Sequence, residues 1–377
     1  MKKIIVLTIS DLIYEANLHR KLMSLTKSGC NVRLLAAYHP NLNIEIWQGI
    51  DLTRIRLIKK TTIIKFVHFL LFSFLWVIFR KADLYISYDT LPLLPVKIAS
   101  ALHRKPFIYD SVELLAGLNQ LEEKPIRKKI WMCYEKRGIK GVNRLITVCQ
   151  SDASHIKTLY KDLPEPVVVR NTPEFKRIKA GHQVVRNKFR IPADHWIGIY
   201  QGMLFEGRGL RNLIRAIPGR DKFTLIIVGQ GPLMPELKNM AKELKIEDRV
   251  IYTGLVPFYE LHDYTASADI GFTIISGKGL SYYHALPNKL FEYIQAGIPV
   301  IGSDYPEIKK IIEEDDIGYT VNPESVEEIS QAIKKMLDEE NYKKFKNRIL
   351  KISEKYTWQQ ESQIYLRTIK SVLSEKI

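Results

Sequence analysis

Short apolar runs alternate with helix-like stretches along most of this 377-residue chain. In the first half, the runs of strand length are residues 3–8, 32–37, 83–87, 107–110, 145–149 and 167–170. The stretches between them have the apolar periodicity of helices. This alternation predicts βα units and a parallel sheet.

The same pattern starts again in the second half. Its strand-like runs are residues 196–200, 224–228, 250–253, 270–275, 299–302 and 318–321. Helical periodicity then continues from about residue 326 to the end. The polar, basic stretch 174–190 has weak periodicity, so we place a linker there. The sequence thus predicts an α/β protein with two doubly wound parallel-sheet domains, residues 1–174 and 192–358, which hold ligands in the cleft between them.

Composition narrows the choice of partners. The formal net charge is +16, which indicates an anionic partner: nucleic acid, an anionic membrane face or a phosphorylated substrate. The basic residues are dispersed and form no recognisable nucleic-acid module, so nucleic acid is the least favoured. The cysteines Cys30, Cys133 and Cys149 fit neither a disulfide framework nor a metal spacing, which indicates a reducing, cytoplasmic setting. The first apolar run is too short for a signal peptide.

Two segments raise the question of a membrane. Residues 66–79 are almost entirely apolar and lie between Lys65 and Arg80, but about 20 apolar residues are needed to cross a bilayer. A fully buried crossover helix is favoured over a helix that dips into one leaflet. In residues 124–144, lysines and arginines surround Trp131. This pattern fits a solvated helix face or a contact with anionic lipid, and the sequence leaves both open.

A short helix is predicted between Pro287 and Gly297. Proline suits the first helical position, and glycine suits the left-handed residue just past the end. Asn288 and Glu292 are four apart and share a face, with Lys289 beside them in the first turn. A helix start with a lysine and an amide predicts an anion site, and the carboxylate can accept hydrogen bonds from sugar hydroxyls.

Glycine loops follow the first two strands of the second domain. Gly202 leads to Gly207-Arg208-Gly209, and the next strand ends at Gly229 and Gly231. Glycines allow a phosphate to approach the backbone, although tight strand-to-helix turns have the same composition. The first strand of the chain has no Gly-x-Gly-x-x-Gly, and no phosphate loop ends in Gly-Lys-Ser/Thr. The absence of both motifs argues strongly against a nicotinamide enzyme or a P-loop NTPase.

These loops and the Pro287 helix, in this order, resemble the family-4 retaining glycosyltransferases. The resemblance covers the whole chain, including the first-half segments 83–89 and 107–113 and the closing Tyr356-Thr357-Trp358. It implies a GT-B fold, with two Rossmann-like domains facing across a cleft and a C-terminal helix, about 359–377, crossing back to the first. It also implies that the second domain binds a nucleotide-sugar donor. The candidate donor-binding residues are Gly202, Arg208, Gly229, Gly231, His284, Leu286, Pro287, Asn288, Lys289, Leu290 and Glu292.

Three positions depart from the family pattern. His284 stands where the first carboxylate of the Glu-x7-Glu motif is expected, and Met203 replaces the first cation of an Arg-x4-Lys pair. Val112 occupies the usual histidine position of the acceptor domain. The resemblance then implies that the protein stabilises the departing diphosphate, with Arg208 and Lys289 as catalytic residues, while a donor phosphate oxygen accepts the proton.

Four acidic residues of the first domain are candidate acceptor ligands: Asp11, Asp89, Asp110 and Glu113. Their other interpretation is helix capping, which we favour for Asp11. We expect no metal, because Asp315-Asp316 has the pattern of a solvated loop. No cofactor is expected either, since the nucleotide sugar would be a substrate.

The sequence therefore predicts a hexosyltransferase-type enzyme that builds a cell-surface polysaccharide on a glycan or lipid-linked acceptor. A UDP-sugar is the favoured donor, and the expected location is the cytoplasm, with the inner membrane face as a candidate site. Three alternatives stay open: a nucleotide-sugar epimerase, a non-catalytic binder of nucleotide sugars or glycans, and a basic membrane scaffold or nucleic-acid binder.

Overall fold

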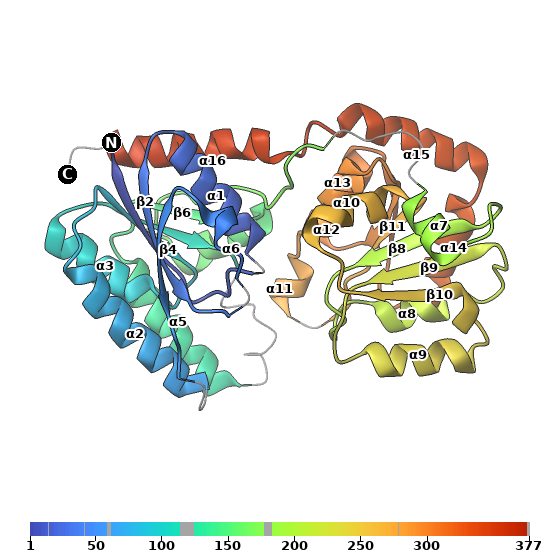
Figure 1. Cartoon of the computed structure of the whole chain (residues 1–377), viewed down its shortest axis with the longest axis horizontal. Coiled ribbons are helices and arrows are strands. Elements are labelled where there is room, and N and C mark those ends of the chain that lie inside the picture. Colours follow the sequence, from blue (N-terminus) through green and yellow to red (C-terminus); the bar gives the residue numbers. More distant parts are fainter. Residues whose placement is uncertain are drawn as a thin grey trace. The chain divides into compact units, whose positions relative to one another are not determined.

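The computed structural model describes residues 1–13, 15–40, 42–58, 62–113, 124–176, 183–277 and 279–374, without the side chains of Thr62, Phe258 and Tyr259. The chain divides into two compact units (Figure 1). Unit 1 comprises Met1–Asn171 and Gln360–Ile377, and unit 2 comprises Thr172–Gln359. Each unit has one parallel sheet with helices, so the predicted α/β fold class is confirmed.

Unit 1 contains a seven-stranded sheet in the order β3-β2-β1-β4-β5-β6-β7. Its strands are β1 (Lys3–Leu7), β2 (Asn31–Ala37), β3 (Ile50–Ile55), β4 (Leu84–Tyr88), β5 (Phe107–Ser111), β6 (Arg144–Thr147) and β7 (Val167–Val168). Its helices are α1 (Ala16–Lys27), α2 (Thr62–Ile78), α3 (Leu93–His103), α5 (Pro125–Ile139), α6 (Gln150–Leu159) and α16 (Trp358–Ser374), with a short 3₁₀ helix at Glu45–Trp47. The strand order reverses between β1 and β4, which is where ligands bind in sheets of this type.

Unit 2 repeats this topology with six strands in the order β10-β9-β8-β11-β12-β13. The strands are β8 (Trp196–Gln201), β9 (Phe223–Val228), β10 (Val250–Gly254), β11 (Ile270–Thr273), β12 (Val300–Ser303) and β13 (Gly318–Val321). The helices are α7 (Val184–Phe189), α8 (Leu210–Arg215), α9 (Met234–Glu243), α10 (Phe258–Ala266), α11 (Leu280–Tyr283), α12 (Asn288–Gln295), α13 (Pro306–Glu314), α14 (Val326–Met336) and α15 (Glu339–Ile352), with a 3₁₀ helix at Glu247–Arg249. Here the order reverses between β8 and β11.

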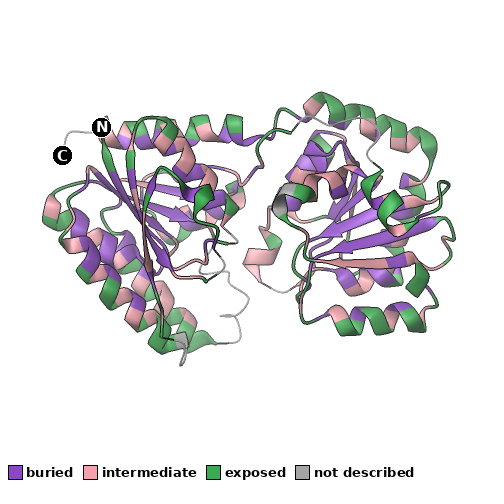
Figure 2. Cartoon of the chain, viewed as in Figure 1, coloured by how far each residue is buried: buried purple, intermediate pink, exposed green. Residues whose placement is uncertain are grey.

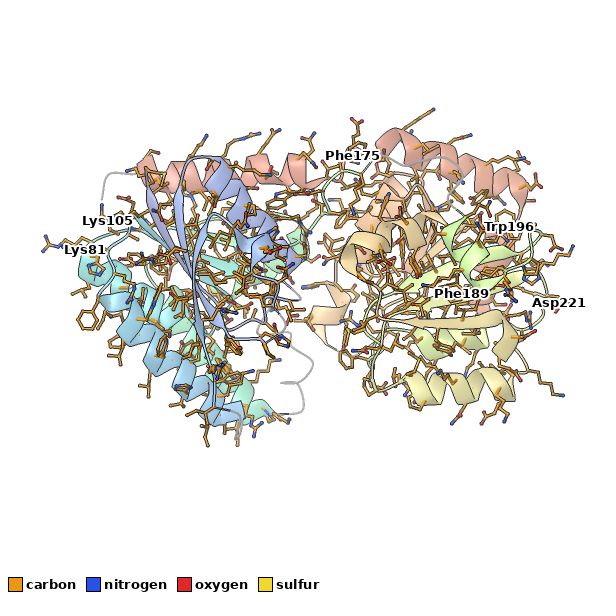
Figure 3. All side chains as sticks on the ribbon, viewed as in Figure 1. Lys81, Lys105, Phe175, Phe189, Trp196 and Asp221 are labelled. Atoms are coloured by element: carbon orange, nitrogen blue, oxygen red, sulfur yellow. The ribbon has the colours of Figure 1, made fainter. Side chains whose placement is uncertain are left out.

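The predicted linker contains structure that the sequence pattern did not reveal. Residues 184–189 form α7, and Val185 is fully buried in the core of unit 2. Figure 3 labels Phe189 at the end of this helix and Trp196 at the start of β8. The part of the predicted linker at residues 177–182 lies outside the described residues. Weak periodicity is expected of a helix this short, because it buries only one side chain.

Apolar side chains from the sheets and the covering helices fill both cores (Figure 2). In unit 1 the C-terminal helix α16 contributes Tyr365, Ile369 and Val372, each at most 1% exposed. Glu361 of this helix accepts hydrogen bonds from the backbone N–H of Arg170 (2.9 Å) and from its guanidinium (3.2 Å). The chain therefore ends inside the unit in which it begins.

Helix α2 differs from its sequence-based prediction. The segment was expected to be fully buried, but Leu71 and Leu75 are 62% and 58% exposed. A uniformly apolar sequence does not reveal which side of a helix has neighbours, so burial was overestimated. No helix in the described part of the chain combines the length and apolar character needed to cross a bilayer.

Candidate functional site

The candidate donor site lies where unit 2 reverses its strand order, at the carboxyl ends of β8 and β11. Helix α12 begins there at Asn288, one residue later than predicted, because Pro287 has extended backbone angles and precedes the helix. Gly297 has φ +70° just past the helix end, as predicted. No side chain caps the N-terminus of α12. The Leu290 N–H donates to the Pro287 carbonyl oxygen at 3.1 Å, so the N–H groups of the first two helical residues are left for an anion.

Lys289 is the most unusual side chain at this site. It is 8% exposed, and its ammonium lies 3.7 Å from the centroid of the Tyr200 ring. Its Nζ has no hydrogen-bond partner among the described residues. Burial, followed by the nearby Arg208 guanidinium, lowers the pKa of Lys289 well below its ordinary value, and the Glu292 carboxylate opposes this shift. A buried cation that lies against an aromatic face, with no hydrogen-bond partner among the described residues, would gain strongly from an anion.

Glu292 is held by a chain of hydrogen bonds. The amide of Gln201, at the end of β8, donates to the Glu292 carboxylate. The hydroxyl of Thr265 donates to the other end of the Gln201 amide at 2.8 Å. The carboxylate is thus fixed in direction one turn after Lys289. The sequence reasoning missed Gln201 and Thr265, although Gln201 directly precedes the glycine that follows β8.

The glycines after β8 and β9 allow two loops to pack closely. A Cβ atom at Gly229 would lie 1.9 Å from the carbonyl oxygen of Gly202, and one at Gly231 would lie 2.4 Å from that of Leu204. These contacts explain both glycines by packing, whatever ligand lies beside them. Gly202, with φ +135°, faces Lys289, and a Cβ there would lie 3.5 Å from the lysine Nζ.

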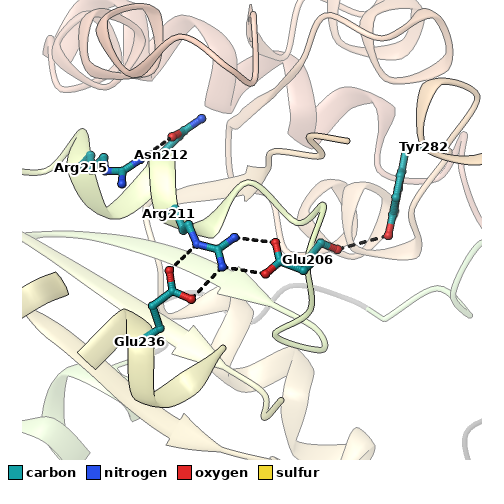
Figure 4. A network of polar contacts seen from close by, with 6 residues as sticks. All are labelled: Glu206, Arg211, Asn212, Arg215, Glu236 and Tyr282. Carbon is teal, nitrogen blue, oxygen red and sulfur yellow. Dashed lines mark hydrogen bonds and ion pairs between the residues drawn. The ribbon is translucent and has the colours of Figure 1, made fainter. Parts of the chain in front are cut away.

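An ion-pair network fixes the loop that carries Arg208 (Figure 4). The Arg211 guanidinium pairs with Glu206 and with Glu236, and each of the closest pairs is 2.5 Å. The Tyr282 hydroxyl donates to the Glu206 carbonyl oxygen at 3.2 Å. Arg211 is therefore neutralised by two carboxylates, whereas Arg208 has no ion pair within the described residues. Arg208 lies 5.8 Å from the Tyr282 ring.

The other predicted donor residues lie on or next to α11 and α12. His284 ends α11 and is half-buried, with its ring 5.9 Å from that of Tyr283. Leu286 and Pro287 are half-buried, and Asn288 is exposed. The remaining one, Leu290, is fully buried in the core, so that only its backbone can contact a ligand.

In unit 1, acidic side chains gather at the carboxyl ends of β1 and β4. Ser10 donates to Asp89 at 3.0 Å, and Tyr88 donates to Glu15 at 3.1 Å. Burial, then the Glu15 carboxylate, raises the pKa of Asp89 to about 7, and Glu113 contributes in the same direction. Asp89 also has φ +78°, an uncommon backbone angle for a residue other than glycine. The sequence reasoning missed Glu15, because nothing in its local pattern marks it as a neighbour of Asp89.

The other two candidate acceptor residues are engaged within unit 1. Asp110 is 1% exposed, and both its oxygens accept from the Lys21 ammonium, at 2.8 and 2.7 Å. Asp11 accepts from the Ile13 backbone N–H at 3.2 Å in a turn before α1, rather than capping that helix. Its carboxylate also lies 3.6 Å from the His39 ring.

The raised pKa of Asp89 predicts a pH-dependent effect of Asp89→Asn. The folded state keeps this proton to higher pH than the unfolded state, so the stabilisation is present at acidic pH and is lost as pH rises through about 7. Asparagine stays neutral and tolerates the positive φ. We expect the melting temperature of the variant, relative to wild type, to be higher at pH 8 than at pH 5.

Asp83→Asn provides the control for this measurement. A backbone hydrogen bond from Lys3 lowers the pKa of Asp83, so its stabilisation is already present above the ordinary aspartate pKa. The control should lose stability by similar amounts at both pH values. Equal shifts for Asp89→Asn at pH 5 and pH 8 would contradict the assignment.

The comparisons with known proteins agree with this geometry. Residues 182–354, which carry the donor candidates, match the family model described as glycosyl transferases group 1. This part of the chain is therefore similar to the group 1 glycosyl transferases. The match does not resolve the finer family-4 assignment. Within the described residues, no group of three or more histidine, cysteine, aspartate or glutamate side chains is arranged to hold a metal ion.

Two curated proteins show which sequences this chain resembles. An uncharacterized glycosyltransferase of Methanocaldococcus jannaschii is 24% identical over 58% of this chain and 60% of its own length. A GDP-mannose-dependent alpha-(1-6)-phosphatidylinositol monomannoside mannosyltransferase of Mycobacterium tuberculosis is 25% identical over 44% of each chain. The alignments thus cover less than two thirds of either relative.

Solved structures extend the likeness to the whole chain. HepE from Anabaena, crystallised with UDP and glucose, has a TM-score of 0.80 at 14% identity, covering 98% of this chain and 100% of HepE. At this identity the likeness concerns the fold. It confirms the GT-B architecture that the sequence resemblance implied.

Proposed function

We propose that this chain transfers a hexose, with retention of configuration, from a nucleotide-diphosphate sugar to a glycan or lipid-linked saccharide of a cell-surface polysaccharide. One observation carries the proposal. The buried Lys289 ammonium has no polar partner among the described residues, yet it lies beside Arg208 at the strand reversal of the unit that is similar to the group 1 glycosyl transferases. Two cations and an uncapped helix start form a site that lacks only its anion.

The chemistry assigned to this site is stabilisation of the leaving group. When the bond between the sugar and the diphosphate breaks, negative charge develops on the diphosphate oxygens. Lys289, Arg208 and the first N–H groups of α12 would stabilise that charge in a site with little water. The acceptor proton would pass to a donor phosphate oxygen, so neither Val112 nor His284 has to act as a base. The proposal includes no metal ion or cofactor.

Glu292 would bind the ribose of the donor. Its carboxylate is fixed by Gln201, and a carboxylate can accept two hydroxyl hydrogen bonds. We favour a uridine nucleotide, in line with the UDP bound in the HepE structure, and the mannosyltransferase relative makes guanosine donors the necessary comparison. We place the reaction in the cytoplasm.

Glu292→Gln is expected to weaken nucleotide-sugar binding roughly tenfold or more, because a hydrogen bond to a charged group contributes about 1.5–3 kcal/mol. The folded protein should keep its stability, since a glutamine oxygen still accepts from Gln201. Isothermal titration calorimetry with UDP-glucose measures the change. Glu313→Gln, at an exposed position of α13, removes the same charge elsewhere and should bind as wild type does. Equal affinities for both variants would contradict the role of Glu292.

The proposed function is tested by thermal shift followed by turnover. UDP, GDP and their sugar derivatives are added singly, and a ligand that binds only the folded protein raises its melting temperature. Labelled donor and lipid-linked oligosaccharides then report sugar transfer. Failure of every nucleotide sugar to stabilise the protein would overturn the proposal. Stabilisation without transfer would favour a non-catalytic binder, an alternative suggested by Val112 and His284, and conversion of the sugar without acceptor would indicate an epimerase.

A further inference from the structure

Helix α2 presents apolar side chains to solvent along its whole length. Ile63, Val67, Leu71 and Leu75 follow one another at four-residue spacing and are 66%, 49%, 62% and 58% exposed. Phe79, just after the helix, is 79% exposed. A helix on the surface of a soluble domain normally turns a polar face outward. A stripe of this length instead marks a surface that binds something apolar.

Helix α5 extends this stripe. The Phe66 ring of α2 packs edge-on against Trp131 of α5, with centroids 5.7 Å apart. Figure 1 shows α2 and α5 running alongside each other in unit 1. On α5, Ile126 and Ile130 are 76% and 63% exposed. We call the following residues the α2–α5 surface: Ile63, Val67, Leu71, Leu75, Phe79, Ile126 and Ile130.

Within the described residues, the exposed charges carried by α2 and α5 themselves are of one sign. The exposed basic residues on or next to the two helices are Lys65, Lys81, Lys124, Arg127, Lys129, Lys136, Arg137 and Lys140. Figure 3 shows the Lys81 side chain extending away from unit 1. The one acidic residue in the sequences of α2 and α5 is Glu135, which is 5% exposed and accepts hydrogen bonds from Tyr109 and Tyr160. Exposed apolar groups thus lie among positive charges that no neighbouring carboxylate of these helices offsets.

We propose that the α2–α5 surface docks on an anionic lipid bilayer, with α2 lying in the interfacial plane. Lipid provides both an acyl boundary for the leucine stripe and phosphate headgroups for the flanking lysines and arginines. Helix α2 has 17 residues, fewer than a span requires, so the helix lies on the membrane and does not cross it. The docking depends on the lipid alone, independently of sugar transfer.

Vesicle flotation with the full chain tests the proposal. Vesicles of phosphatidylcholine alone are compared with vesicles that also contain phosphatidylglycerol, at low and high salt. We expect binding to the anionic vesicles and weaker binding at high salt, because exposed charges are screened. Equal binding to both vesicle types, or to neither, would overturn the proposal.

Two pairs of matched variants locate the contact. Arg127→Glu with Lys129→Glu should lower the partition onto anionic vesicles roughly tenfold or more. The control pair, Lys238→Glu with Lys242→Glu on α9 of unit 2, makes the same change in charge and should bind as wild type does. Leu71→Gln with Leu75→Gln should likewise reduce binding. The control variant is Leu255→Gln with Leu350→Gln, because these two leucines of unit 2 are exposed to a similar degree.

These variants also distinguish a lipid partner of the α2–α5 surface from a protein partner. All the substituted side chains are exposed, so melting temperatures should stay close to that of wild type. Light scattering reports whether the chain associates with itself. One outcome would assign the surface to a second copy of the chain and overturn the proposal. In that outcome the wild type forms a dimer and does not float with vesicles, and Leu71→Gln with Leu75→Gln dissociates the dimer. Equal loss of flotation in the test and control pairs would overturn it too.

Discussion

Lys289→Met is expected to reduce nucleotide-sugar-dependent turnover by about 100-fold or more while leaving the folded protein at least as stable as wild type. The activity falls because the departing diphosphate loses a buried cation, comparable to losing an oxyanion-hole donor worth about 2.7–4 kcal/mol. Stability is retained because the unliganded ammonium is buried without a polar partner among the described residues. Methionine fills a similar volume against the Tyr200 ring.

The pH dependence of stability gives this prediction a second readout. The pKa of Lys289 is lowered by folding, so the unfolded state holds this proton to higher pH than the folded state. Lys289 therefore makes the free energy of unfolding increase as pH rises towards the ordinary lysine pKa. This increase with pH should disappear in Lys289→Met. Urea unfolding at several pH values measures it.

A surface lysine provides the control. Lys310→Met, on the exposed side of α13, removes the same charge outside the site. Both the turnover and the pH dependence of the free energy of unfolding should therefore stay as in wild type. Turnover of Lys289→Met within a few-fold of wild type would contradict the assigned role. A large loss of stability would instead show that Lys289 has a structural partner.

The second large effect is on stability: Lys21→Met should lower the free energy of unfolding by about 3–5 kcal/mol. Lys21 and Asp110 are each 1% exposed, and the substitution leaves the Asp110 carboxylate buried without its cation. Burial already raises the pKa of Asp110, and Lys21 opposes that shift. In the variant the folded state would hold the Asp110 proton to higher pH, so the loss should be smaller at pH 5 than at pH 8.

A double substitution checks the physical cause. Lys21→Met with Asp110→Leu removes both charges and should recover much of the lost stability. The reason is that no charged group then stays buried without a partner, and two apolar side chains can pack against each other. Arg33→Met breaks the exposed pair with Asp51, whose side chains are 41% and 50% exposed, and should cost less than about 1 kcal/mol. A double variant as unstable as Lys21→Met would contradict a charge-burial effect.

The fold could be predicted from sequence because the central strands of both sheets are buried on both faces and therefore form continuous apolar runs. Strand β13 was predicted with the observed bounds, and the other predicted strands differ from the observed ones by one or two residues at their ends. Strand β3 was missed. It lies at the edge of its sheet, and Asp51 and Arg54 interrupt its apolar sequence. An edge strand makes fewer contacts and tolerates such residues, so it leaves a weaker sequence signal.

The candidate site was only partly visible in the sequence. Local signals located the start and end of α12, because proline and glycine act on the backbone at their own positions. Sequence spacing does not reveal burial, and therefore the depth of Lys289 against Tyr200 was not predicted. The same applies to the hydrogen bonds of Gln201 and to Glu15 beside Asp89, which join residues from separate elements. Whether the predicted ligands bind at these places stays a prediction.

The return of α16 to unit 1 has a practical consequence for anyone who wishes to study the halves separately. The polypeptide passes between the units twice, at residues 171–172 and 359–360. A gene fragment that stops at codon 171 would encode a unit 1 without Tyr365, Ile369 and Val372, and the hole would expose the Lys21–Asp110 pair to water. Isolating that half requires splicing two distant coding regions through a designed connector, whereas the other half is a single uninterrupted stretch.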